Sequence, residues 1–86
     1  MSGAAPGVAL SELAAGEGGK IVALELPPEA KQRLLEMGMT VGAQIEVVRY
    51  APLGDPVDIK VRGYHLSIRK HEAAGIFVAR NEEQRV

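Results

Sequence analysis

The sequence predicts a mainly β protein, a small barrel of about five short strands with one short helix between the first and second strands. The chain has 86 residues and no cysteine, so we expect one small domain without disulfide bonds. Apolar and polar residues alternate strictly over residues 57–62 and again over 64–69, which is the period of half-buried strands. Strands this few and short cannot build two full sheets, whereas a bent barrel closes their edges.

The composition divides the chain into three parts. Residues 1–9 are small and turn-forming and predict a flexible N-terminus, residues 10–80 carry the apolar patterns of the domain, and residues 81–86 form a polar C-terminal tail. The first residues lack the basic and apolar segments of a secretory signal. No apolar run approaches the roughly 20 residues of a membrane helix. Together with the absence of cysteine, these features predict a cytoplasmic protein.

The first predicted elements are a helical turn and a strand. Residues 10–13 can form one helical turn capped by Ser11, and Gly16, Gly18 and Gly19 are expected to end it in a flexible turn. The run from residue 20 to 26 is almost continuously apolar, which predicts a strand with cover on both faces.

A short helix is predicted from about residue 28 to 37. Pro28 fits the first helical position, where its missing N–H costs nothing. Glu29 and Arg33 are four residues apart and can pair on the solvent face. At the other end, Gly38 supplies a left-handed residue and an apolar Met39 follows it, which is the sequence pattern of a Schellman motif.

A β-hairpin is the most sharply specified element. A strand over residues 44–50 and a loop over 52–56 precede it, and its two alternating segments meet at a two-residue turn, Arg62-Gly63. In this register all apolar residues share one face, and a slip by one residue would mix the two faces. A short helical turn over 71–75 and a last strand over 76–80 complete the domain. The predicted facing pairs are Val57 with Ile68, Ile59 with Leu66, and Val61 with Tyr64.

Residues that carry chemistry are few and scattered. The glycine-rich segment 16–20 lacks the Gly-Lys-Ser/Thr ending of a phosphate loop. Asp58, His65 and Ser67 share a strand face, but an exposed strand without a pocket does not make a hydrolase. The two histidines are separated by cations and have no carboxylate cluster beside them. We therefore predict no catalytic residue, no metal site and no cofactor.

The charge is small overall but unevenly distributed. The net charge is −1, residues 10–47 are mainly acidic, and residues 60–71 carry cations and two histidines with no acid. This basic stretch is either a solvated strand face or a patch that meets an acidic partner. Its one aromatic residue, Tyr64, is predicted to point inward, so stacking on bases is not expected and no nucleic acid is predicted as a partner.

Apolar loop residues offer a second candidate surface. Met37 and Met39 stand at the helix end, and Tyr50 and Leu53 stand at a strand end and the following loop. They either close the end of the barrel or form a groove for an extended peptide. The candidate partner-binding residues from both surfaces are Met37, Met39, Tyr50, Leu53, Lys60, Arg62 and Arg69.

An ordered set of motifs runs over roughly residues 8 to 80 and includes Leu10-Ser11-Glu12-Leu13, Arg33-Leu34-Leu35-Glu36-Met37-Gly38-Met39, Ala51-Pro52-Leu53-Gly54-Asp55-Pro56 and Ser67-Ile68-Arg69-Lys70. This set resembles the FeoA family, named for ferrous iron transport protein A. The resemblance implies an SH3-like barrel in the cytoplasm of a bacterium or archaeon, acting as an interaction module and not as an enzyme. It implies a partner, the cytoplasmic region of FeoB, a membrane Fe(II) transporter with a GTP-binding domain. Contact with the membrane would then be through that partner only, and a weak homo-oligomer stays open.

A second class of function shares the same barrel. The resemblance extends to the C-terminal domain of metal-dependent repressors of the diphtheria-toxin-repressor type, which implies a regulatory or nucleic-acid-binding barrel. Those repressors carry a helix-turn-helix domain and metal ligands upstream, for which 86 residues leave no room. Binding to nucleic acid that weakens steeply with salt would favour this second class.

Overall fold

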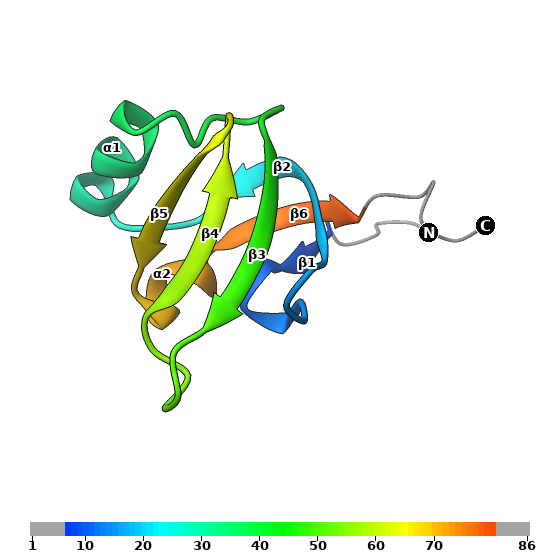
Figure 1. Cartoon of the computed structure of the whole chain (residues 1–86). Coiled ribbons are helices and arrows are strands. Elements are labelled where there is room, and N and C mark those ends of the chain that lie inside the picture. Colours follow the sequence, from blue (N-terminus) through cyan, green and yellow to red (C-terminus); the bar gives the residue numbers. More distant parts are fainter. Residues whose placement is uncertain (1–6, 81–86) are drawn as a thin grey trace.

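The computed structural model describes residues 7–80 as one antiparallel sheet of six strands with short helices at its margins (Figure 1). The strand order is β1-β6-β2-β3-β4-β5, and β6 passes behind β3 and β4 in Figure 1. No helix within residues 7–80 is long and apolar enough to span a membrane. The elements are β1 (Val8–Ala9), the 3-10 helix η1 (Leu10–Glu12), β2 (Gly18–Leu24), α1 (Pro28–Glu36), β3 (Gln44–Tyr50), β4 (Val57–Val61), β5 (Tyr64–Ile68), α2 (Lys70–Ala73) and β6 (Ile76–Arg80).

The prediction of a mainly β fold is confirmed. The short helix was predicted between the first and second strands, but α1 connects β2 to β3, because the short strand β1 precedes them. The predicted count of five strands is wrong. Val8 and Ala9 form a sixth strand that pairs with Val78 and Phe77 of β6. The N-terminus predicted to be flexible over 1–9 therefore enters the sheet at its end. Residues 1–6 and the predicted tail 81–86 lie outside the described residues.

The sheet is open rather than closed into the predicted barrel. Its two edges are β1 and β5, and neither pairs with the other. Closure would require β5 to pair along its length, whereas β1 offers only two residues. Register shifts in β2 and β3 mark bulges, which bend strands. The bend lets six short strands enclose a core while one long edge stays free.

The core lies inside the bent sheet and is entirely aliphatic at its centre. Most of its fully buried members come from β2, β3, β4 and β6, and Leu34 is the one fully buried residue of α1. Leu10 of η1, Met39 after α1 and Ala73 of α2 complete the set. The other side chains of α1 are partly or fully exposed, so the helix stands beside the sheet rather than across it. The largest fully buried side chains are Leu10, Ile21, Leu34, Met39, Ile45, Val47, Val57, Ile59, Val61, Ile76 and Val78.

The glycines of β2 correct another prediction. Gly18 and Gly19 belong to the strand and not to a flexible turn. A side chain at Gly19 would overlap the carbonyl oxygen of Ala79, and one at Gly18 would overlap that of Ile45. The two glycines thus allow β3 and β6 to approach β2 closely. The predicted cap is also wrong, because the N-cap of η1 is Ala9 and no side chain caps it.

The predicted hairpin register is confirmed at every pair of β4 and β5. Arg62 and Gly63 both have positive φ, 53° and 87°, as a two-residue type I′ turn requires. Tyr64, predicted to point inward, is instead 44% exposed. Its hydroxyl donates to the carbonyl of Met37 over 2.6 Å, so it fastens the end of α1 to the hairpin. The ring shares the inner face with Val61, which lies opposite Tyr64 in the register, and it stays exposed because an edge strand has no further strand to cover it.

The end of α1 is the Schellman motif that the sequence predicts. The Met39 amide donates to the Leu34 carbonyl and the Gly38 amide donates to the Leu35 carbonyl, both over 3.0 Å. Gly38 has the left-handed φ of 93°. The turn directs Met39 into the core, where it is fully buried.

Tyr50 is a structural residue at the end of β3. Its hydroxyl donates to the carbonyl of Leu13 over 2.5 Å and approaches that of Ser11 at 3.3 Å, which ties the strand to the segment after η1. Burial, with a smaller contribution from the nearby Glu17 carboxylate, raises the pKa of Tyr50 above 10.0.

Substitution of Tyr50 by phenylalanine is expected to lower the free energy of unfolding by about 1 kcal/mol, because the buried carbonyl of Leu13 loses its donor. The denaturant midpoint at pH 7 measures this loss. Above pH 10 the unfolded chain releases the Tyr50 proton more readily than the folded protein, so stability falls with rising pH. This part of the loss of stability above pH 10 should be absent in Tyr50→Phe. If the free energy of unfolding falls equally with pH in both proteins, the pKa of Tyr50 is not raised by folding.

Candidate partner-binding surface

The seven candidate residues are divided between the two ends of the β3–β4 pair. Ile45 pairs with Val61 at one end, and Tyr50 pairs with Val57 at the other. Seven residues of strand separate these ends by about 20 Å. The end of α1 around Met37 lies at the Ile45–Val61 end, and the loop that carries Leu53 follows the Tyr50–Val57 end (Figure 1). The structure therefore does not bring them together in one groove.

The candidates at the helix end serve the fold. Met39 is fully buried and offers no surface to a partner, which corrects its assignment. Met37 is partly buried against the core. The Arg62 side chain donates from Nε to the carbonyl of Gly38 over 3.0 Å and from its terminal nitrogen to Thr40 over 3.1 Å. Arg62 thus satisfies a carbonyl at the end of α1 and draws the hairpin turn onto the helix.

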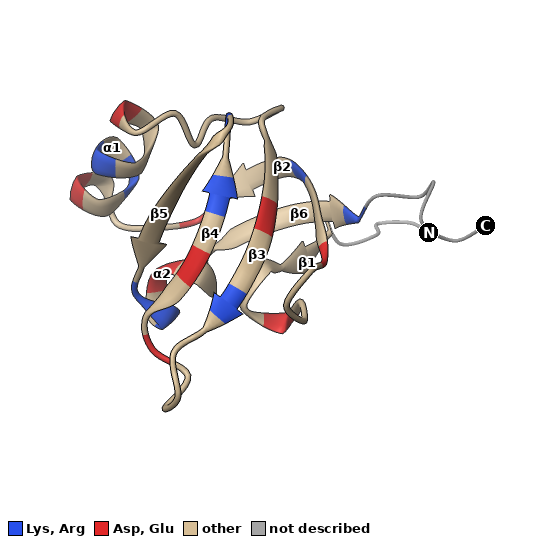
Figure 2. Cartoon of the chain, viewed as in Figure 1, with Lys and Arg blue, Asp and Glu red and all other residues tan. Residues whose placement is uncertain are grey.

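The outer face of β3, β4 and β5 carries mixed charge and is not a basic patch. Lys60 lies opposite Glu46 on one side and His65 on the other. Asp58, on the same face, accepts hydrogen bonds from Arg49 over 3.0 Å and from Ser67 over 2.6 Å. Figure 2 shows the two signs alternating along β3 and β4.

The expected trio of Asp58, His65 and Ser67 does not form a nucleophile. The Ser67 hydroxyl donates to Asp58 and not to an imidazole. That hydrogen bond, followed by the charge of Arg49, holds the pKa of Asp58 below its ordinary value. The ionised carboxylate of Asp58 stabilises the strand pair, and within residues 7–80 the Ser67 hydroxyl has no hydrogen bond to an imidazole that could activate it.

The second end of the sheet carries an exposed apolar residue beside a groove. Leu53, at the tip of the β3–β4 loop, is 94% exposed. The groove has a volume of about 500 Å³ and lies where α1, the end of β5 and α2 meet. Its lining residues are Arg33, Pro56, Ser67, Ile68, Arg69 and Glu72.

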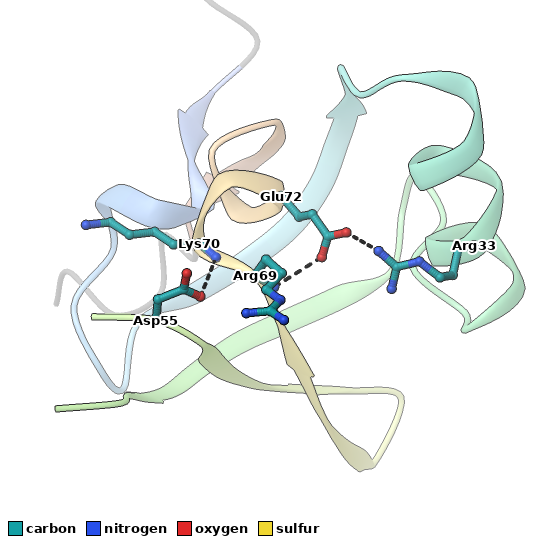
Figure 3. Close-up of polar contacts among 5 residues, drawn as sticks. All are labelled: Arg33, Asp55, Arg69, Lys70 and Glu72. Carbon is teal, nitrogen blue, oxygen red and sulfur yellow. Dashed lines mark hydrogen bonds and ion pairs between the residues drawn. The ribbon is translucent and has the colours of Figure 1, made fainter. Parts of the chain in front are cut away.

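Two carboxylates fix the first turn of α2 at this groove (Figure 3). Glu72 is only 4% exposed; it accepts from the backbone N–H of Arg69 over 3.1 Å and forms an ion pair with Arg33. Asp55 accepts from the N–H of Lys70 over 3.0 Å. The spacing of Glu29 and Arg33 had predicted an ion pair between these two residues. Arg33 instead binds Glu72, which lies 39 positions later in the chain.

The guanidinium of Arg69 remains available to a ligand. Figure 3 shows it turned away from the carboxylate of Glu72. Among residues 7–80, the Arg69 side chain has no hydrogen bond or ion pair. Of the seven candidates, Leu53 and Arg69 are therefore the two that lie near one another with free side chains, at the end of the sheet marked by the 51–56 loop and α2.

Replacement of Arg33 by methionine is expected to lower the free energy of unfolding by about 1–3 kcal/mol, because the buried Glu72 carboxylate loses its cation. Chemical denaturation measures the loss. In a Glu72→Gln background the same replacement should cost clearly less. Equal costs in both backgrounds would show that Arg33 acts through packing alone.

This arrangement can bind but offers no chemistry of its own. Within the described range 7–80, no three His, Asp or Glu side chains come together in a group that could hold a metal ion. The exposed features are an apolar loop tip, a free guanidinium and a groove at a sheet edge. They define the class: a small β-sheet binding module.

The particular family follows from comparison with known proteins. The FeoA domain family matches residues 8–80, and this chain belongs to it. Its members are accessory proteins of ferrous iron transport rather than enzymes. The resemblance inferred from the sequence motifs is thereby confirmed.

Two relatives illustrate the family. A fusion protein of Fe(2+) transport protein A and the Fe(2+) transporter FeoB from Porphyromonas gingivalis is 44% identical over 69 residues, which are 80% of this chain and 8% of the fusion protein. This chain thus spans a small part of that relative's length. The solution structure of a FeoA protein from Chlorobium tepidum is 38% identical, with a TM-score of 0.81 over 85% of this chain and 70% of that one.

Other solved structures bear on the fold. The FeoA of Stenotrophomonas maltophilia, described as a prokaryotic SH3 domain protein and complexed with zinc, is 26% identical with a TM-score of 0.68, over 80% of this chain and 86% of that one. An SH3-like fold is accordingly the family's fold. A manganese-dependent transcriptional repressor shares the fold at 14% identity, with a TM-score of 0.81 over 92% of this chain and 39% of the repressor.

Proposed function

We propose that this chain is a non-catalytic cytoplasmic module that binds the cytoplasmic region of a FeoB-type ferrous iron transporter and supports or regulates Fe(II) uptake. The observation that carries the proposal is the fusion relative, which holds the same domain and FeoB in one polypeptide. Contact with the membrane is through this partner.

The fusion supports a docking function for a physical reason. A covalent tether keeps two domains at an effective concentration near the millimolar range, so weak docking suffices there. Docking without such a tether must take the same occupancy from the surface of the domain itself. We therefore expect the docking surface to lie among side chains that the fold itself does not use.

Leu53 and Arg69 meet that requirement. The exposed Leu53 supplies apolar area, and Arg69 supplies charge that steers approach and orients the partner. Met37, Tyr50 and Arg62 hold the fold together, and Lys60 is flanked by acids. The docking surface of this proposal is thus the end of the sheet that holds the 51–56 loop and α2.

Replacement of Leu53 by glutamate tests this surface. Affinity for the transporter's cytoplasmic region, measured by titration calorimetry with and without nucleotide, is expected to fall at least tenfold. The matched control is Val41→Glu, which places the same charge on an apolar residue that is 63% exposed at the opposite end of β3. A wild-type protein that does not bind would overturn the function, whereas equal loss in both variants would overturn the surface.

A regulatory barrel that binds nucleic acid is the second candidate, because repressors share this fold. The mixed charge around Lys60 disfavours it, since nucleic acid requires a coherent basic surface. A mobility shift with a steep salt dependence would favour this candidate over the first.

A further inference from the structure

Strand β5 is an open edge of the sheet. It pairs only with β4, and its register is continuous over all five residues. The two-residue turn makes Val61 and Tyr64 a hydrogen-bonded pair, and such pairs alternate along an antiparallel ladder. The backbone N–H and C=O groups of His65 and Ser67 therefore point away from β4. Both residues are exposed, and within residues 7–80 their backbone groups have no partner in another segment.

The usual protections of a sheet edge are missing on β5. Edge strands are commonly shortened, bulged, interrupted by proline or covered by another element. This strand is five residues long and has neither a bulge nor a proline. Helix α1 stands beyond it and is held near its carboxyl end, where the Tyr64 hydroxyl binds the Met37 carbonyl and Arg33 of the last turn forms the ion pair with Glu72. Neither of these contacts uses an outward backbone group of β5.

The groove at the end of this edge carries more positive than negative charge. It contains two cations, Arg33 and Arg69, and a single acid, Glu72. Glu72 is already matched by Arg33 and by the Arg69 backbone N–H. The Arg69 guanidinium is the remaining, uncompensated charge, so the groove is complementary to a carboxylate.

We propose that an extended, acidic segment of the partner protein adds to β5 as a seventh strand. Its backbone would pair with the outward N–H and C=O groups of His65 and Ser67, and a carboxylate side chain would bind Arg69. Strand addition takes its affinity from main-chain hydrogen bonds and its specificity from the side chains beside them. This inference rests on the proposed function, because it names how the transporter's cytoplasmic region is held.

Proline at position 67 blocks strand addition selectively. Ser67→Pro removes an outward N–H and leaves the hydrogen bonds to β4 in place, as proline on an edge strand does. Affinity for the transporter's cytoplasmic region is expected to fall at least tenfold. The matched control, Ser67→Ala, loses the same hydroxyl contact to Asp58 but keeps the N–H, and should bind within threefold of wild type. Circular dichroism verifies the fold of both variants.

Charge reversal tests the acidic character of the segment. Arg69→Glu should weaken binding at least tenfold and reduce its salt dependence. Lys20→Glu makes the same charge change at an exposed residue of β2, three strands away from β5. It should leave the affinity within threefold of wild type. Equal effects of the two reversals would overturn the role of Arg69.

Amide hydrogen exchange on the wild-type complex tests the edge without any variant. The amides of His65 and Ser67 should exchange at least tenfold more slowly when the transporter's cytoplasmic region is bound. Binding without this protection, or binding that Ser67→Pro leaves intact, would overturn the edge proposal and leave the proposed function standing. A dimer that sediments as such in wild type and is lost in Ser67→Pro would instead assign the edge to a second copy of the chain and overturn the acidic partner segment. Absence of any binding by wild type would overturn the proposed function itself.

Discussion

Replacement of Ile59 by alanine is expected to lower the free energy of unfolding by about 3–4 kcal/mol, a large part of what a domain of this size has. Ile59 is fully buried at the centre of β4, between β3 and β5. The truncation removes buried apolar contacts and leaves a cavity. The strands on both sides of β4 prevent that cavity from collapsing. A denaturant titration at pH 7 gives the midpoint and slope that measure the loss.

The comparison with Leu66→Ala makes this test specific. Leu66 lies directly opposite Ile59, and the sequence assigns both to the same inner face. Leu66 is nevertheless only partly buried, because β5 has no strand on its other side. We expect Leu66→Ala to cost less than half as much as Ile59→Ala. Equal midpoints for the two variants would mean that the edge of β5 is covered in solution.

Gly38→Val is expected to produce the second large effect, a loss of about 3 kcal/mol in the free energy of unfolding. A β-branched residue is strained at the φ of 93° that the Schellman motif needs. A side chain there would also approach the Tyr64 hydroxyl at 3.0 Å and the Arg62 side chain at 3.1 Å, the groups that fasten the end of α1. Thermal unfolding followed by circular dichroism measures the change.

Gly42→Val is the control for Gly38→Val. Gly42 has a similar φ of 97°, but nothing lies within 4 Å of a side chain added there. Gly42→Val should therefore show the backbone strain without steric crowding, and its loss in free energy of unfolding should be smaller. A control in the N-terminal segment would not serve, because a side chain at Gly7 would overlap the Val78 carbonyl. Equal losses at positions 38 and 42 would mean that the contacts with Tyr64 and Arg62 contribute nothing.

The hairpin and the helix were predictable from sequence because their determinants are local. Alternation over 57–62 and 64–69 admits one register that buries every inward residue, and the structure has that register. The helix end needs only Gly38 followed by an apolar residue, and both hydrogen bonds of the motif are present. For Leu53 the sequence left two alternatives open, closing the end of the barrel or forming a groove for a partner, and the structure leaves its side chain 94% exposed.

The sequence determined the five longer strands, the helix and the family resemblance, whereas the tertiary structure added β1 and decided which surfaces remain for a partner. Met39 and Leu53 are both apolar residues at turns, yet one is fully buried and the other is 94% exposed. Arg33 binds Glu72 rather than Glu29, and β1 takes an edge of the sheet. Such pairings join residues far apart in the chain, so no local period encodes them. Within residues 7–80, the same long-range order leaves the outer edge of β5 unpaired and Arg69 without a counter-charge. Only the complete packing shows which backbone and side-chain groups have found partners.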